Sequence, residues 1–295
     1  MKHAAVFPLV LFGLAACAGP GGVTPSGGLM YQVPETPTVT YVAESSQDIS
    51  IDAGAMGSMN MTASSEATLG MTFSAGAEGV QVTTAFEDVS ASMTQPMGGS
   101  LSASESDIEG NLVFTLDERG RGTVVTLPEV KGSAEQLVSP ASFVYEFFPR
   151  LPGGAVDPGE TWTDTIKYDI QTGQGDLSSN SVLTYTLVGD TVVDGTSLLH
   201  ITYEGQADVV GSGMTEGMEV IQTFSGDVTG MFLWDPARGI MVGGESSQDM
   251  DGAVEVPAAG MPPIASITAA MRPAVSCCFH DRQQSCQALL PDRSA

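Results

Sequence analysis

The feature that most constrains the fold of this chain is an alternation of apolar and polar residues along most of its length. Segments 80–86, 112–116, 183–187 and 199–203 each carry their large apolar side chains two residues apart. Successive side chains of a β-strand point to opposite faces, so this period predicts antiparallel strands with one buried face. We therefore predict a mainly β domain over residues 38–271, built as an antiparallel half-barrel or as a sandwich.

One segment departs from this alternation. Within residues 133–149, Ser139 can cap a helix and Pro140 suits the first helical position, where its missing N–H is not needed. Apolar residues follow as far as Phe148, and Pro149 then ends the segment. We predict a short helical insert here, between two blocks of strands.

The N-terminus has the organisation of an export signal. Lys2 precedes an apolar stretch, which ends in Leu14-Ala15-Ala16-Cys17 and is too short to cross a bilayer of ~30 Å. These residues resemble the lipobox of bacterial lipoproteins. The resemblance implies that residues 1–16 are a signal peptide and that Cys17 becomes a lipidated N-terminus. Ala18, in place of Asp, implies sorting to the outer membrane under the rule known for Gram-negative lipoproteins.

The two ends of the chain are expected to lack regular structure. Gly and Pro are frequent after Cys17, so residues 17–37 are predicted to be the lipidated cysteine and a flexible tether. Residues 272–295 lose the Gly, Asp and Thr texture of the domain and are predicted to form a disordered tail. The tail holds the three remaining cysteines and His280, which are donor types for zinc, but we interpret them as part of an unstructured segment: Cys277, Cys278 and Cys286.

Two hairpin-like segments resemble each other. Residues 110–120 and 230–239 each read as a Gly, a short apolar strand, an Asp, a turn and a second Gly. The Asp is predicted to close an Asx-type turn, and the last Gly to take a positive φ. Either the chain has two related halves, 38–130 and 155–260, or these features are simply common to two β-hairpins.

A wider resemblance rests on structural motifs. Phe148-Pro149, and the turn from Pro158-Gly159 to Trp162 that opens a strand, are similar to motifs of bacterial lipoproteins with a conserved β-rich domain of unknown function. The resemblance covers residues 38–260 and implies no catalytic residue. The order of strands, helical crossover and strands is also similar to half-barrel lipoproteins and lipoprotein carriers, which hold acyl chains between a curved sheet and helices.

Composition argues against several functions. The net charge is −25, from 10 Lys and Arg against 35 Asp and Glu, so a nucleic-acid partner is not expected. Within residues 38–271, His200 is the single histidine, and no nucleophile or metal motif accompanies it. We expect no catalytic residue, no metal and no cofactor. Asp251-Gly252 is interpreted as a hairpin turn rather than a calcium loop.

The chain is rich in methionine, with 15 residues. Met adapts to irregular apolar surfaces, so together with Phe it can line a deformable interior suited to acyl chains. The candidate lining residues are Met71, Phe73, Phe86, Met93, Met218, Met231 and Phe232. The sequence therefore predicts a non-enzymatic envelope lipoprotein that binds a lipid-like ligand or an envelope protein. The alternatives are a structural or assembly lipoprotein without a cavity and, more weakly, a carboxylate-based envelope hydrolase.

Overall fold

The computed structural model describes residues 28–52, 57–94, 99–172, 175–215, 218–256 and 265–278. The predicted signal peptide, Cys17, His280 and Cys286 lie outside these residues. Within the described part of the chain, no helix combines the length and the hydropathy required to cross a bilayer.

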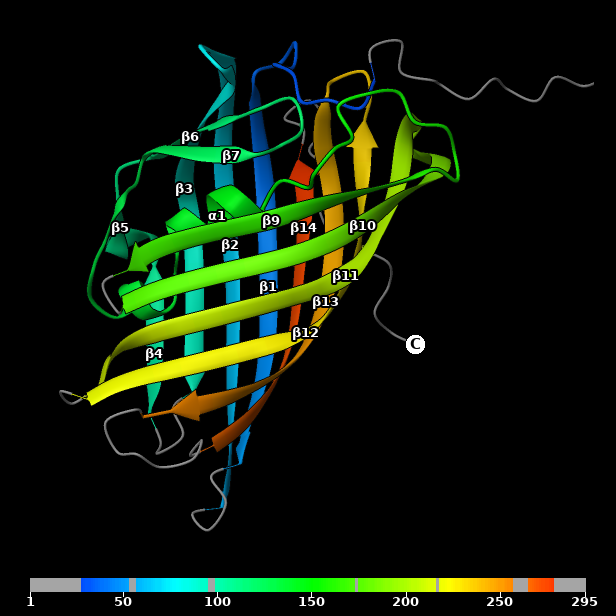
Figure 1. Ribbon diagram of the computed structural model, residues 1–295. Helices are drawn as coiled ribbons and strands as arrows, with labels where there is room; N and C mark the ends of the chain where they lie inside the picture. The colour runs from blue at the N-terminus through cyan, green and yellow to red at the C-terminus, as the bar shows by residue number, and fades with distance from the viewer. Residues whose placement is uncertain are drawn as a thin grey trace, which may run out of the picture.

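The described residues form one large antiparallel sheet, one small strand pair and three short helical segments (Figure 1). The strands are β1 Thr38–Asp52, β2 Ser58–Gly76, β3 Gly79–Thr94, β4 Ser100–Ser104, β5 Ile108–Glu109, β6 Leu112–Leu116, β7 Gly122–Thr126, β8 Glu129–Val130, β9 Thr161–Thr172, β10 Gly175–Val193, β11 Thr196–Thr215, β12 Met218–Asp235, β13 Ile240–Glu255 and β14 Ala265–Cys278. The helical segments are the 3-10 turns η2 Glu105–Asp107 and η3 Gly132–Gln136, and the α-helix α1 Pro140–Glu146. The mainly β prediction is confirmed.

The large sheet has the order β7-β6-β3-β2-β1-β14-β13-β12-β11-β10-β9, and β4 also pairs with β3. Bulges interrupt the register at Thr68/Leu69, Leu187 and Leu233/Trp234. A bulge bends its strand and increases the local twist, which lets so wide a sheet curl. The result is the half-barrel of the sequence analysis rather than the sandwich, and β9–β12 cross in front of β1–β3 (Figure 1).

A charged cluster joins the two ends of the curled sheet. Asp164 on β9 is buried, and its carboxylate accepts hydrogen bonds from Arg119 at 2.8 Å and from Arg121 at 3.1 Å. Both arginines belong to the turn between β6 and β7, at the opposite edge of the sheet. Arg119 also donates to the carbonyl of Leu151 at 3.1 Å. These contacts hold β9 near β7, although the two strands do not pair.

Near this closure the interior is filled by aromatic rings. Phe148, just after α1, is fully buried and has its ring centroid 5.6 Å from Tyr31, 6.3 Å from Phe73 and 6.0 Å from Phe114. Tyr31 also lies edge-on to Trp234 at 4.9 Å. Edge-to-face pairs add to the free energy of burying such large rings. We call this region the packed end.

The helical insert forms where the sequence predicts it. The Ser139 hydroxyl accepts a hydrogen bond from the Ser142 amide, and Pro140 is the first residue of α1. The helix lies inside the curve of the sheet, where it contacts β7 and β9 (Figure 1). The predicted cap and the predicted insert at 133–149 are therefore confirmed.

Both predicted ends of the domain are wrong by several residues. Residues 28–37 form no regular element, but they are not a free tether, because Leu29 and Tyr31 are buried. The Leu29 amide donates to Gly154, and the Tyr31 amide donates to Glu118, both at 3.0 Å. Residues 272–278 belong to β14 rather than to a disordered tail, because β14 fills the place between β1 and β13. Cys277 is buried there, and burial raises the pKa of its thiol.

The two similar hairpins share their turn geometry. The Asp117 side chain accepts from the amides of Arg119 and Arg121, and the Asp235 side chain accepts from those of Ala237 and Arg238. The glycine that ends each turn, Gly120 or Gly239, has a positive φ of 80° or 67°. The predicted turn chemistry is confirmed, whereas the origin of the two halves stays a hypothesis. Asp251-Gly252 is no turn, because β13 passes straight through it.

Candidate functional site

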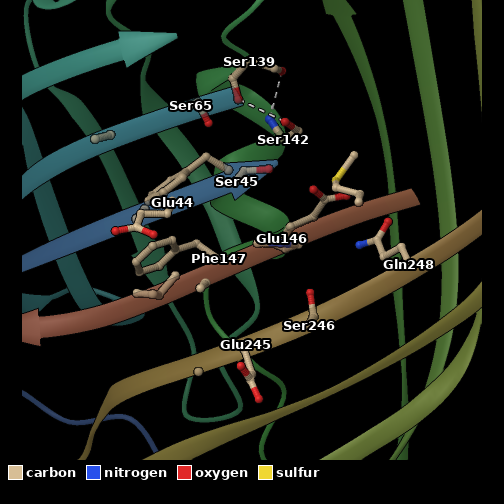
Figure 2. A pocket seen from close by; sticks show the side chains of 18 of the residues that line it. Glu44, Ser45, Ser65, Ser139, Ser142, Glu146, Phe147, Glu245, Ser246 and Gln248 are labelled. Atoms are coloured by element: carbon tan, nitrogen blue, oxygen red, sulfur yellow. Dashed lines mark hydrogen bonds between the residues drawn. The ribbon is translucent and has the colours of Figure 1, made fainter. Parts of the chain in front are cut away.

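A cavity of about 410 Å³ lies between α1 and the inner face of the sheet. Its lining comes from β1–β3, from β9–β14 and from α1 with the residues that precede it (Figure 2). Binding sites for small molecules have volumes of about 300–1,000 Å³. The half-barrel therefore holds a space of suitable size for a ligand.

The cavity exists because the inward side chains become small at one level of the sheet. On β1, Val39 and Tyr41 are buried at the packed end, and the next inward positions are Ala43 and Ser45. The same change occurs on β2, β3, β10, β11 and β13, whose small lining residues are Ser65, Ala67, Ala91, Ser179, Ser181, Ala207, Gly244 and Ser246. The pairings Ala43–Ala67, Ser45–Ser65 and Ser181–Ala207 place small residues side by side. Aligned small residues leave the space that large residues fill nearby.

The rest of the lining is mostly apolar. Phe143 and Phe147 project from the helical segment, with their rings 4.4 Å apart. The opposite walls supply aliphatic and aromatic side chains: Phe86, Val89, Ile166, Leu183, Tyr185, Tyr203, Val209, Val228 and Phe232. A surface of this kind favours contact with an apolar molecule, at about 25 cal/mol for each Å² removed from water.

Glu146 places a carboxyl group in this apolar space. It is the last residue of α1, and its carboxylate accepts a hydrogen bond of 2.5 Å from the hydroxyl of Tyr168 on β9. The residue is exposed to solvent on the cavity side, and the cavity walls close to its carboxyl raise the pKa of that group by partial desolvation. Desolvation also raises the pKa of Tyr168, so its hydroxyl remains a donor.

Neutral polar side chains also line the cavity. Ser139, Ser142, Ser246 and Gln248 also line the cavity, and Figure 2 shows Ser246 and Gln248 pointing toward the side that Glu146 occupies. Hydroxyl and amide groups can accept or donate hydrogen bonds as a ligand requires. The cavity therefore combines a long apolar wall with one polar region.

The seven predicted lining residues divide into three groups. Phe86, Met231 and Phe232 line the cavity. Met71 and Phe73 are buried in the packed end, where no space is left for a ligand. Met93 lies on β3 outside the lining, and Met218 is 47% exposed at the start of β12. The sequence located apolar residues but could not tell which of them border a space.

The described residues contain no group of three His, Cys, Asp or Glu placed to hold a metal ion. Glu44 and Glu66 face each other across β1 and β2 in a polar groove of about 270 Å³. Both side chains are exposed on the outer face, whereas the general acid of a glycosidase is usually kept protonated by burial. This pair gives the hydrolase alternative little support.

No protein-family model matches the chain, and no curated protein matches it significantly. The solved structures similar to it include DynF from the dynemicin biosynthesis pathway of Micromonospora chersina, with 10% identity over 88% of this chain and 92% of that one and a TM-score of 0.23. OccAB3 of Acinetobacter baumannii has 7% identity over 82% and 99%, with a TM-score of 0.21. OpdO of Pseudomonas aeruginosa has 8% identity over 83% and 98%, with a TM-score of 0.20. Similarities at TM-scores this low do not establish a function.

Proposed function

We propose that this protein is a lipid-anchored lipoprotein of the outer membrane that binds an apolar, chain-like ligand inside its half-barrel. The cavity carries this proposal, because its inward small residues lie at one level on several strands rather than at scattered positions. A mostly apolar lining in contact with water is unfavourable, and an apolar ligand would remove it from water. The proposed anchor rests on the sequence Leu14-Ala15-Ala16-Cys17.

The binding test uses the full chain with Cys17→Ala, exported to a host periplasm and released without a lipid anchor. Native mass spectra are expected to show adducts of lipid mass, and added long-chain amphiphiles are expected to be taken up. The variant Ala67→Phe fills the cavity from β2 and should abolish the adducts. Thr72→Phe, exposed on the outer face of the same strand, is the matched control and should retain them.

A clean ligand-free mass, with no uptake by any chain-like probe, would contradict the ligand-binding proposal. That result would favour the structural or assembly lipoprotein, with an envelope protein as its partner. The anchor is tested separately by the membrane fraction of the cell. The unmodified chain should remain there, and Cys17→Ala should appear in the soluble fraction.

A further inference from the structure

The cavity lining is unusual in its charge. Four acidic residues border the cavity, whereas no Lys, Arg or His among the described residues does. Arg150 is buried, but it donates to the carbonyls of Gly120 and Tyr145, outside the lining. Arg272 borders the outer groove instead. A negatively charged ligand group would therefore find no counter-charge in this cavity.

Only one of the four acids is directed into the space. Glu44 and Glu245 lie next to the inward residues Ser45 and Ser246, so the alternation of a strand turns them to the outer face. Figure 2 shows Glu245 pointing away from Ser246. Glu66 is opposite Glu44 and shares its face. Glu146, on α1, is the acid that projects inside.

Glu146 has a neutral partner but no cationic one among the described residues. Its hydrogen bond comes from Tyr168, whose hydroxyl carries no charge. A carboxylate that faces a mostly apolar space and lacks a counter-ion attracts a cation, because the low-dielectric walls screen the attraction less than bulk water does. Aromatic faces such as those of Phe147 and Tyr203, which line the same space, also favour a cation.

We propose that the ligand is an amphiphile with a single apolar chain and a positively charged amine head. The head pairs with Glu146, and the chain lies against the small inward residues of the strands, such as Ala43 and Ala67. This inference rests on the proposed ligand-binding function and names the chemistry of its ligand. An ammonium group has three N–H donors. Glu146 can accept one, and the oxygens of neighbouring lining residues such as Ser246 and Gln248 can accept others. An anionic head would lose its water and meet Glu146 as a like charge.

The experiment compares three probes with the same chain and different heads: oleylamine, oleyl alcohol and oleate. Each displaces an apolar fluorescent dye from the full chain carrying Cys17→Ala, at neutral pH and below micelle formation. Oleylamine is expected to bind about tenfold or more tightly than oleyl alcohol, which is the ratio for one charge-assisted hydrogen bond. Oleate is expected to bind more weakly than the alcohol.

The variant Glu146→Gln isolates the charge, because it keeps an oxygen acceptor for Tyr168. It should remove the preference for the amine and leave the affinity for oleyl alcohol within about twofold. Asp48→Asn removes an exposed acid from β1, outside the lining, and is the matched control. It should keep the amine preference.

The outcomes separate the two proposals. Equal binding of the three probes, or an unchanged amine preference in Glu146→Gln, would overturn the amine inference and leave the lipid-binding function intact. Loss of all three probes in a Glu146→Gln protein with an unchanged unfolding transition would also overturn it, because Glu146 would then shape the cavity rather than select charge. Failure of every probe on the parent chain would overturn the proposed function itself.

Discussion

The packed end and the level of the cavity, which we call the hollow end and which includes Ala43, Ala67 and Ala207, share the same strands but differ in what those strands direct inward. Tyr41 and Ala43 are neighbours on the inner face of β1, yet Tyr41 packs at 5.4 Å from Phe147 and Ala43 borders the cavity. Tyr41 also donates a hydrogen bond to the Met241 carbonyl at 2.7 Å. A single step along a strand therefore separates residues that stabilise the fold from residues that leave space.

The comparison shows that stabilising the fold and leaving space for a ligand depend on different levels of the same strands. The packed end supplies the aromatic burial and the Asp164 cluster that close the sheet. The hollow end then needs no large inward side chains to remain open. Changes at the packed end are expected to alter stability, and changes at the hollow end to alter binding.

The largest effect is expected from Phe148→Ala. Phe148 is fully buried against at least five aromatic neighbours, so its removal should lower the free energy of unfolding by about 3–5 kcal/mol. Urea denaturation followed by tryptophan fluorescence measures this change. Leu127→Ala, at a position that is 48% exposed, is the control and should change little. A loss below about 1 kcal/mol in Phe148→Ala would contradict the distinction between the two ends.

The next largest effect is a difference in stability between two variants that each gain a phenylalanine ring. Val82→Phe enlarges a fully buried residue of β3 at the packed end and should cost about 1–3 kcal/mol, because no space exists for the added atoms. Ala67→Phe places the ring in the cavity and should change stability by less than about 1 kcal/mol while it blocks ligand uptake. Equal costs in the two variants would mean that the cavity cannot accept a ring.

A smaller effect is expected when the closure of the sheet is weakened. Asp164→Asn removes the charge between Arg119 and Arg121, whose side chains are 35% and 51% exposed. Because water can solvate the freed arginines, the loss should be about 1 kcal/mol, well below that of a fully buried pair. Hydrogen exchange should rise in β9 more than in β1. An equal rise in both strands would show that the cluster does not act at the edge.

The smallest effect concerns the pH dependence that Glu146 contributes. Its folded-state pKa is raised above the ordinary value of 4.5, so the folded protein holds this proton more tightly than the unfolded chain does. The stabilisation is present at low pH and is lost as the pH rises through the raised pKa. Unfolding free energies of the parent and Glu146→Gln, measured from about pH 4 to about pH 8, should therefore diverge, with the parent losing stability relative to the variant. Parallel curves would contradict the desolvation of this carboxyl.

The strands and the helical insert could be predicted because they depend on local patterns. The period of two at 183–187 and the Ser139-Pro140 cap each follow from the chemistry of neighbouring residues. Residues 272–278 of β14 were assigned to the tail because their Arg and Cys residues resemble its composition, whereas the strand is held by pairing with strands far away in the sequence. The Asp251-Gly252 turn was wrong for a related reason. Pairing of β13 with β12 on one side and β14 on the other extends the strand through a dipeptide that usually turns.

The site was harder to predict than the fold because the cavity is defined by what its residues lack. Large apolar side chains are the usual sequence signal for an apolar ligand site. Met71 and Phe73 carry this signal, but they fill space rather than border it. A usable signal was present on β2. Its inward positions, read from Phe73 back to Ser65, change from large to small residues. Glu146 could not be singled out, since a lone acid among 35 acidic residues becomes distinctive only when the fold directs it inward.

The position of β14 also affects how the chain can be made. β14 pairs with β1 on one side and β13 on the other, so the first strand of the sheet meets the last one. Until residues 265–278 are synthesised, β1 and β13 each present an unpaired edge that other chains can join. Such distant pairing slows folding, and the sheet cannot be completed before β14 is made. A chain shortened before residue 265 is therefore expected to expose the edges of β1 and β13 and to aggregate, because β14 lies in the middle of the sheet.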